Sequence, residues 1–476
     1  IDKPLRLNIY FDGQEKDSYK SGMGAARFDC QIHDSLHMSL SASVFQTSEE
    51  EFYDVEAQYW LGSLDNSLGS ENFGEVVDNR GVGGYLRHAR NELFAQVYNA
   101  EYRGKLFMPS SNLEWGAKYQ HELIDDRLRE WQLIDSSGFS TPQGGDDILE
   151  LFEFVQADNE LSSSRYSAFV QQSGFFTKDS MRFTYSLGLR SQYWSLNEEL
   201  FVSPRVSLSY LPNWNRDVLF RASLGSYNQS PFYRELRDKK GSLYTNLKAQ
   251  KSIHFVLSAD YNFTSWSRPF KFVGELYYKK LNDIIPYEID NLRIRYLPEL
   301  TATGYTMGVD MRVNGEFVPG VESWASLSLM SSKEDIDNDG HGYIPRPTDQ
   351  RCSFSLFFQD YLPNRPSYKM NLKLHYSSGL PTGALNSKRH EQLIRIPSYK
   401  RVDIGFSKIV KDGSTGSKSK YFKHFESLVV SAEVFNLLGI RNTISYLWVT
   451  DVVQNQYAVP NYLTTRLLNL KIQAKF

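Results

Sequence analysis

The sequence predicts an all-β fold, a transmembrane antiparallel β-barrel, from three observations. First, alternating apolar and polar residues recur along the whole chain of 476 residues, as expected of strands whose successive side chains point to opposite faces. Second, several of these stretches exceed the roughly five or six residues of a globular strand and suit a bilayer crossing of about 9–11 residues. Third, the connections alternate between short and long, as periplasmic turns and extracellular loops do in outer-membrane barrels.

The composition agrees with this class and argues against others. No stretch approaches about 18 consecutive apolar residues, so no transmembrane helix is predicted, whereas short alternating strands remain compatible with a membrane barrel. The 30 Phe, 30 Tyr and 8 Trp suit aromatic girdles at the membrane interfaces, although a secreted all-β protein would show the same excess. The net charge is −3 without a basic stripe, so nucleic acid is not an expected partner.

The period of two predicts about eighteen strands. The clearest is IHFVLSADYNF, residues 253–263, in which the apolar residues occupy every second position. The predicted strands span residues 5–14, 21–31, 37–60, 91–104, 111–135, 163–177, 181–195, 200–211, 217–236, 249–266, 269–289, 302–317, 322–335, 350–362, 368–381, 399–412, 426–439 and 463–476.

The connections fall into two sets, which predicts the two rims of the barrel. The short set comprises residues 32–36, 178–180, 212–216, 267–268, 318–321 and 363–367, with a longer exception near 412–424. The long set comprises residues 61–90, 136–162, 237–248, 290–301, 336–349, 382–398 and 440–462. We therefore expect loops 61–90, 136–162 and 440–462 on the extracellular rim and turn 318–321 on the opposite rim.

The last strands predict which side chains face lipid and which face the lumen. Residues 463–476 should pair antiparallel with residues 426–439, and opposite charges on neighbouring strands favour one register. The predicted lumen set is Lys373, Asp403, Glu433 and Lys471, and the predicted lipid set is Leu374, Ile404, Val434 and Ile472. A slip of one residue would exchange the two sets.

The chain resembles the C-terminal barrel of the TonB-dependent outer-membrane receptors. LGLRSQYWSLNEELFVSPRVSLSYLP (187–212) and FRASLGSYNQSPFYREL (220–236) are similar to two consecutive family segments, and a final strand ending in Phe476 resembles the signal read by the insertion machinery. The segments YIPRPTDQR, AEVFNLLG and NQYAVPNYLTTRLLNLKIQAKF resemble the branch common in Bacteroidota. The resemblance covers essentially the whole chain and is carried by the order of these motifs.

This resemblance implies a multi-pass protein of the bacterial outer membrane, surrounded by outer-membrane lipid, that takes up a bulky, scarce ligand such as a siderophore, vitamin, glycan or peptide. The family fold is a 22-stranded barrel plugged by an N-terminal domain that couples to TonB. The resemblance also allows for a surface lipoprotein as a partner. We therefore expect residues 1–476 to be one barrel domain that lacks the plug and about four strands, with Ile1 at the periplasmic rim. The alternative is that residues 5–14 and 463–476 pair directly and close a smaller barrel.

One loop contains a candidate calcium site. In DIDNDG, residues 335–340, Asp335, Asp337 and Asp339 alternate before a glycine, as in the first half of a calcium-binding loop. The twelfth position would be Arg346 instead of a bidentate glutamate, so a solvated acidic turn is the competing interpretation.

The loop at residues 440–462 contains candidate ligand-binding aromatics. These are Tyr446, Trp448, Tyr457 and Tyr462, whose ring faces could stack on sugar, peptide or siderophore. The competing interpretation is packing within the loops or at the membrane interface. His88, His341 and His390 fall in or beside loops without a haem-receptor motif, which favours isolated surface histidines.

Three functions follow from these patterns. A TonB-energised transporter is favoured, and the alternative is a receptor-like barrel that serves as a scaffold in a larger outer-membrane complex. A barrel enzyme is disfavoured, because no Ser/His/Asp arrangement stands out and no catalytic residue or resident cofactor is predicted. Bound plug and energy-dependent uptake would separate the first two.

Overall fold

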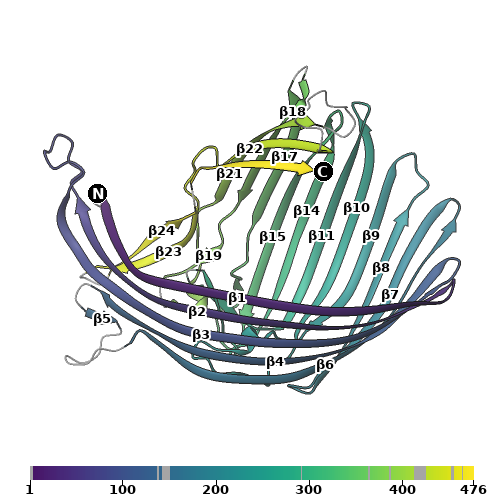
Figure 1. The fold of residues 1–476 in the computed structure, drawn as a ribbon, viewed down its shortest axis with the longest axis horizontal. Coiled ribbons are helices and arrows are strands. Elements are labelled where there is room, and N and C mark those ends of the chain that lie inside the picture. Colours follow the sequence, from purple (N-terminus) through teal and green to yellow (C-terminus); the bar gives the residue numbers. More distant parts are fainter. Residues whose placement is uncertain are drawn as a thin grey trace.

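The computed structural model describes residues 4–136, 139–141, 151–290, 292–362, 365–384, 387–411, 425–451, 455–463 and 465–476. Nineteen strands of these residues form one curved sheet, in which β5 (Phe139–Thr141) and β16 (Ile344–Pro345) are short additions. Consecutive long strands are antiparallel neighbours throughout, which gives an up-and-down order (Figure 1). The predicted all-β, large antiparallel sheet is confirmed. No helix of the described residues is long and apolar enough to span a membrane.

The long strands fall into two groups of different length. The tall wall consists of strands with 26 to 32 residues: β1 (Leu5–His33), β2 (Leu36–Leu64), β3 (Val76–Phe107), β4 (Ser111–Ser136) and β6 (Glu153–Lys178). The short-strand wall consists of strands with 9 to 17 residues: β7 (Met181–Trp194), β8 (Glu199–Leu211), β9 (Asp217–Gln229), β10 (Gln250–Ser265), β11 (Arg268–Ile284), β14 (Ala302–Val318), β15 (Val321–Ile336), β17 (Cys352–Leu362), β18 (Arg365–Ser377), β21 (Tyr399–Lys411), β22 (Ser427–Phe435) and β25 (Leu467–Lys475).

The tall wall extends far beyond the bilayer. At about 3.3 Å per residue, a strand of 29 residues spans roughly 95 Å, against a hydrocarbon core of about 30 Å. Residues 165–178 of β6 pair with β7, whereas residues 153–164 pair only with β4. The extra length therefore lies at the end opposite the short turns, on the extracellular side.

One predicted turn is absent. Residues 5–14 and 21–31 were predicted as two strands, but both belong to β1, whose register with β2 is continuous from Leu5 to Gln31. The intervening residues 15–20, EKDSYK, are polar because this part of the tall wall lies in water on both faces. Such a polar stretch has the composition of a turn. Because one strand replaces two, the N-terminal end of β1 lies at the rim opposite to the one predicted. Leu7 and Ile9 belong to the cluster that Tyr59 and Leu61 form with the loop residue Val449, so this end lies at the extracellular rim and the predicted periplasmic placement is wrong.

The two rims agree with the predicted alternation of connections. Residues 65–75 join β2 to β3, residues 319–320 join β14 to β15, and the loop after β22 carries the hairpin β23 (Thr443–Thr450) and β24 (Gln456–Tyr462). Leu61 packs with Val449, and Phe152 shares a cavity with Trp448, so these loops lie on one rim. The predicted loops 61–90 and 136–162 are shorter than expected, because β2, β3 and β6 continue into them.

The predicted faces of the last strands are confirmed by the register. β22 pairs antiparallel with β25, Lys373 lies opposite Asp403, and Lys373 Nζ reaches Glu433 Oε1 at 3.3 Å. On the other face Ile404 lies opposite Val434, and Ile472 is 72% exposed. The charged set therefore shares the inner face and the apolar set shares the outer face.

The sheet has two free edges within the described residues. The only described partner of β1 is β2, and the only described partner of β25 is β22. Between the described residues of 5–14 and 463–476 there is no direct pairing of the kind that would close a smaller barrel (Figure 1).

Candidate ligand site at the extracellular mouth

A cavity of about 1240 Å³ lies at the extracellular mouth. Its walls come from the start of β6 and from five loops of the short-strand wall, represented by Phe154, Lys240, Ile294, His341, His390 and Trp448. Segments that are distant in sequence converge because each short strand ends near the membrane and is followed by a long loop. The arrangement places aromatic, apolar and charged groups around one space large enough for a small ligand.

The β23–β24 hairpin presents two different faces. Leu447, Val449, Tyr457 and Val459 pack against the ends of the tall wall, at Tyr59 and Leu61. Tyr446 and Trp448 lie on the opposite face, with ring centroids 6.2 Å apart, and both line the cavity. Because side chains alternate along a strand, the packing of one face fixes the other toward the ligand space.

The structure therefore divides the four predicted aromatics. Tyr446 and Trp448 are placed together at the cavity. Tyr457 donates a hydrogen bond to Asp451 Oδ2 at 2.9 Å, an interaction that raises the pKa of its hydroxyl, and its ring packs in the hairpin. Tyr462 lies under the Arg441 guanidinium, 5.9 Å from it, and is absent from the cavity lining.

The charges around the cavity are only partly neutralised. Arg295 pairs with Glu153, and Lys239 pairs with Glu288. Lys240 and Lys388 also line the cavity, and no ion pair joins either of them to a described residue. Two ammonium groups thus remain available to an anionic group of a ligand, beside the carboxylates of Asp337 and Asp339, which line the same cavity.

A buried ion cluster fixes the loop at residues 378–398, which forms one side of the cavity. Glu334 is fully buried, with Arg389 Nη2 at 2.9 Å and Arg346 Nε at 3.1 Å from its oxygens. Burial lowers the pKa of the Arg389 guanidinium, and Glu334 opposes that shift. Since an unpaired buried charge is costly, we expect the docking of the loop to depend on this cluster.

A second cluster anchors the same loop through Arg395, six residues after Arg389. Asp349 is 2% exposed, forms an ion pair with Arg395 and accepts a hydrogen bond from the Ser332 backbone N–H at 2.7 Å. Arg395 Nη1 also donates to the carbonyls of Asp349 and Gly379, at 2.7 and 2.9 Å. The motif YIPRPTDQR therefore supplies Arg346 and Asp349 to two loop anchors.

Two further loops cross from the short-strand wall to the tall wall. In the hairpin β12 (Tyr287–Asp290) and β13 (Arg293–Tyr296), Arg293 reaches Glu51 Oε1 at 2.8 Å and Glu130 Oε2 at 3.5 Å. In the loop at residues 230–249, Tyr233 donates a hydrogen bond of 2.6 Å to the buried Asp126. Burial and this carboxylate raise the pKa of Tyr233. These contacts draw both loops over the lumen.

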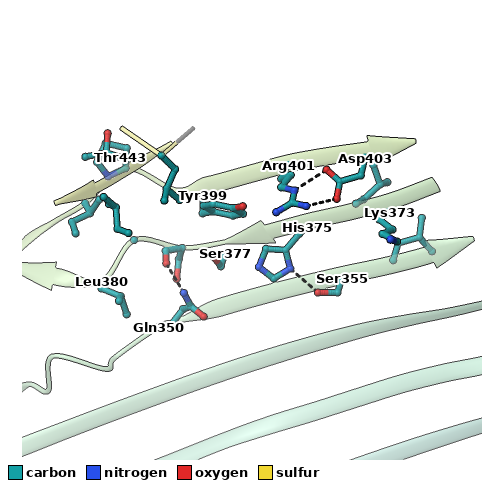
Figure 2. A pocket seen from close by; sticks show the side chains of 18 of the residues that line it. Gln350, Ser355, Lys373, His375, Ser377, Leu380, Tyr399, Arg401, Asp403 and Thr443 are labelled. Atoms are coloured by element: carbon teal, nitrogen blue, oxygen red, sulfur yellow. Dashed lines mark hydrogen bonds and ion pairs between the residues drawn. The ribbon is translucent and has the colours of Figure 1, made fainter. Parts of the chain in front are cut away.

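A smaller pocket of about 600 Å³ lies along β17, β18 and β21 (Figure 2). His375 bonds Ser355 through Nδ1 at 2.8 Å, and Arg401 donates two hydrogen bonds of 2.7 Å to Asp403. Asp403 also accepts from the Asn436 backbone N–H at 2.8 Å, which ties AEVFNLLG to the preceding strand. These polar side chains bond one another and lie among apolar lining residues such as Leu356, Ile396 and Leu463.

The calcium prediction gains no support from the geometry. Asp335 lies within β15, opposite Thr303, while Asp339 accepts a hydrogen bond from the His341 backbone N–H at 2.8 Å. Among the described residues, no group of three or more His, Cys, Asp or Glu side chains is placed to hold a metal ion. Calcium binding by Asp335, Asp337 and Asp339 stays a prediction.

Sequence reasoning missed two features of the mouth. His341 and His390 were treated as isolated, yet their rings stack with centroids 3.6 Å apart. No local pattern could have shown this, because the residues belong to different loops. The anchoring roles of Arg346 and Asp349 could have been suspected from one pattern. Both are charged residues close to the prolines of the motif YIPRPTDQR.

Comparisons with known proteins agree with this architecture. The family model described as TonB dependent receptor-like, beta-barrel matches residues 6–437. The chain is similar in structure to the copper transporter OprC, with a TM-score of 0.57 and 12% identity, over 99% of this chain and 75% of that one. It is also similar to a ferric enterobactin receptor, PfeA of Pseudomonas aeruginosa, in complex with enterobactin, with a TM-score of 0.56 and 11% identity over 97% and 71%.

A third structure, the outer-membrane transporter YddB of Escherichia coli, matches with a TM-score of 0.51 and 11% identity over 96% of this chain and 76% of that one. No curated protein sequence matches significantly. At these identities the structural likeness concerns the fold alone, whereas the family model covers most of the chain. The chain therefore belongs to the family of TonB-dependent receptor β-barrels, which are transport proteins of the outer membrane and not enzymes.

Proposed function

We propose that this barrel captures a bulky, scarce ligand at its extracellular mouth for TonB-energised uptake. The observation that carries the proposal is the cavity of about 1240 Å³. It combines Tyr446 and Trp448 with Lys240 and Lys388, which no ion pair joins to a described residue. Aromatic faces and ammonium groups together suit a ligand with flat rings or sugars and anionic groups, as in many metal chelates. The structurally similar proteins include a copper transporter and a receptor for ferric enterobactin, which is compatible with that class.

The energy coupling belongs to the same proposal. We infer that a plug region interacts with TonB and that about five further strands bridge β1 and β25, one more than the sequence predicted. β1 and β25 run in the same direction, so an antiparallel closure needs an odd number of strands between them. The support is the pair of free strand edges, because unpaired backbone groups cost several kcal/mol each in hydrocarbon. A structure of the full-length receptor should show added strands along both edges. Direct contact between β1 and β25 there would contradict the inference.

The lineage and surface partner are finer points of the proposal. The segments YIPRPTDQR and AEVFNLLG support a place in the Bacteroidota branch, and that placement allows for a surface lipoprotein that covers the mouth. Co-purification from the native outer membrane would test the partner.

The test of ligand capture is recovery of bound cargo. Full-length receptor purified from its native membrane should carry a small molecule detectable by native mass spectrometry. The double variant Tyr446→Ala/Trp448→Ala should lose most of that cargo, since stacking on aromatics contributes about 0.5–1.5 kcal/mol per pair beyond its area. Tyr244→Ala is a matched control, because this residue lies in an outer loop but does not line the cavity. Equal cargo in both variants would contradict the proposal.

A further inference from the structure

The pocket along β17, β18 and β21 adjoins the mouth cavity. Three apolar residues, Leu380, Ile396 and Ile444, line both spaces. From this shared wall the mouth cavity extends over the loop that follows Leu380, whereas the pocket follows β18 back to Lys373 (Figure 2). Because Lys373 lies on the inner face, the pocket continues the ligand space inward along the barrel wall.

The shared wall has a fixed shape because the two ends of its loop are bonded to each other. Ile396 N–H donates a hydrogen bond of 3.0 Å to the Leu380 carbonyl. Arg395 donates hydrogen bonds to the carbonyls of Asp349 and Gly379. A side chain at position 379 would collide with the Ile396 carbonyl, so glycine is needed for this close approach. The wall thus separates spaces of about 600 and 1240 Å³.

The charged side chains that line the pocket are already paired within the barrel wall. Arg401 donates two hydrogen bonds of 2.7 Å to Asp403, and Lys373 Nζ lies 3.3 Å from Glu433 Oε1. An ionic group that entered the pocket would lose its hydration without gaining a free counter-charge, which is costly. The pocket therefore favours the uncharged part of a ligand.

Aromatic rings give this pocket its shape. Trp324 and Phe357 have ring centroids 6.2 Å apart, and Tyr399 lies edge-on to His375 at 5.5 Å. His375 bonds Ser355 through Nδ1, which leaves Nε2 as the ring nitrogen that can meet a ligand. Such a lining suits a flat, uncharged ring with a polar substituent.

We propose that this pocket is an inner subsite for the uncharged, ring-bearing part of the cargo, whose anionic groups stay at the mouth beside Lys240 and Lys388. The occupant follows from continuity, because the two spaces share the wall formed by Leu380, Ile396 and Ile444. The cargo is then amphipathic, with its charge and its apolar rings at separate ends. The entry of cargo rests on the proposed function, whereas the preference of the pocket for uncharged rings does not.

The subsite is tested with 4-benzoylbenzoate, a photoreactive probe that joins an uncharged diaryl ketone to a carboxylate. On illumination the ketone takes a hydrogen atom from a nearby C–H group, and the two carbon radicals combine. Full-length receptor in detergent is labelled and digested, and the labelled peptides are mapped by mass spectrometry. In the wild type, saturable labelling should include β17, β18 or β21.

Two variants alter the pocket in opposite ways. Ser355→Phe adds a ring to the space and should lower labelling of these three strands by at least about ten-fold. Trp324→Ala removes a ring without adding volume, and should raise the half-saturating probe concentration several-fold. The heat-modifiable gel mobility of a folded barrel should be the same for both variants and for the wild type.

Ser223→Phe is the matched control, because Ser223 also bonds a neighbouring strand, through Ser207 at 2.9 Å, but lines neither space. Its labelling should equal that of the wild type. Labelling of β17, β18 and β21 that is unchanged in Ser355→Phe would overturn the proposal, as would wild-type labels confined to the mouth. The probe replaces the native cargo, so this result can be interpreted whatever the outcome of cargo recovery with Tyr446→Ala/Trp448→Ala.

Discussion

The tall wall and the short-strand wall differ in how the chain continues beyond the membrane. Strands of the tall wall continue as paired sheet for 26 to 32 residues, so their backbone groups stay satisfied in water without long loops. Strands of the short-strand wall stop after 9 to 17 residues and pass into loops that carry the hairpins β12–β13 and β23–β24. The loops of the short-strand wall therefore dock against the tall wall.

The contacts between the two walls bear this out. Glu51, Asp126 and Glu130 of the tall wall each form an ion pair with an arginine from a loop of the short-strand wall, and Asp126 also accepts the hydrogen bond of Tyr233. The tall wall also covers the apolar face of the β23–β24 hairpin. The difference in strand length thus determines where the ligand space lies, namely between the loops and the projecting sheet.

The largest effect is expected from the buried ion cluster that holds the loop at residues 378–398. Arg389→Ala leaves Glu334 buried with only Arg346, and breaking such a pair costs about 3–5 kcal/mol. Hydrogen exchange of residues 378–398 should accelerate strongly while the strands stay protected. Arg351→Ala is the control, since its side chain is 65% exposed and its loss should cost about 0.5 kcal/mol or less. Equal exchange in the two variants would show that the loop does not depend on the cluster.

The next effect concerns the short-strand wall in the membrane. Ile472→Arg places a charge on the outer face of β25 and should lower the free energy of unfolding by about 2–4 kcal/mol near the bilayer midplane. Lys471→Ala, on the inner face opposite Ser431, should cost less. Reversible unfolding from lipid vesicles measures both. Equal costs would count against the assignment of the two faces.

A smaller effect is expected where the loop at residues 230–249 meets the tall wall. Tyr233→Phe removes a hydrogen bond to the charged Asp126, which should cost about 1.5–3 kcal/mol of docking. Because folding raises the pKa of Tyr233, its contribution is complete below about pH 10, the unfolded value, and is lost as the pH rises through the folded value. Exchange of residues 230–249 should therefore rise at high pH in the wild type and less in the variant. A pH response that is the same in both would exclude Tyr233 as its source.

The smallest effect is expected at the β12–β13 hairpin. The ion pairs of Arg293 with Glu51 and Glu130 are partly exposed, so Arg293→Ala should cost about 1 kcal/mol or less. The hairpin should then exchange faster and cross-link less efficiently to β2. A loss of protection as large as that of Arg389→Ala would mean that the hairpin, and not the buried cluster, organises the mouth.

The sequence alone was sufficient for the strands of the short-strand wall and for the orientation of their side chains. Lys373, Asp403 and Ile404 fell on the predicted faces because alternation is a local property that lipid on one side and water on the other impose on every residue. The same rule failed for residues 15–20, where both faces of the sheet meet water and the pattern disappears. Of the four predicted aromatics, Tyr446 and Trp448 reached the cavity, while Tyr457 turned to the hairpin core.

The tertiary structure alone decided which loops meet. The stacking of His341 on His390, the burial of Glu334 between two arginines and the reach of Arg293 to Glu51 join residues from different connections. Such contacts depend on where each strand ends and on how the sheet curves, and no periodic pattern within one segment encodes them. The amino-acid sequence by itself determined the membrane barrel and its two faces, because both follow from local alternation. The ligand space was decided only by the fold, because it is the volume left between a tall wall and the loops that dock against it.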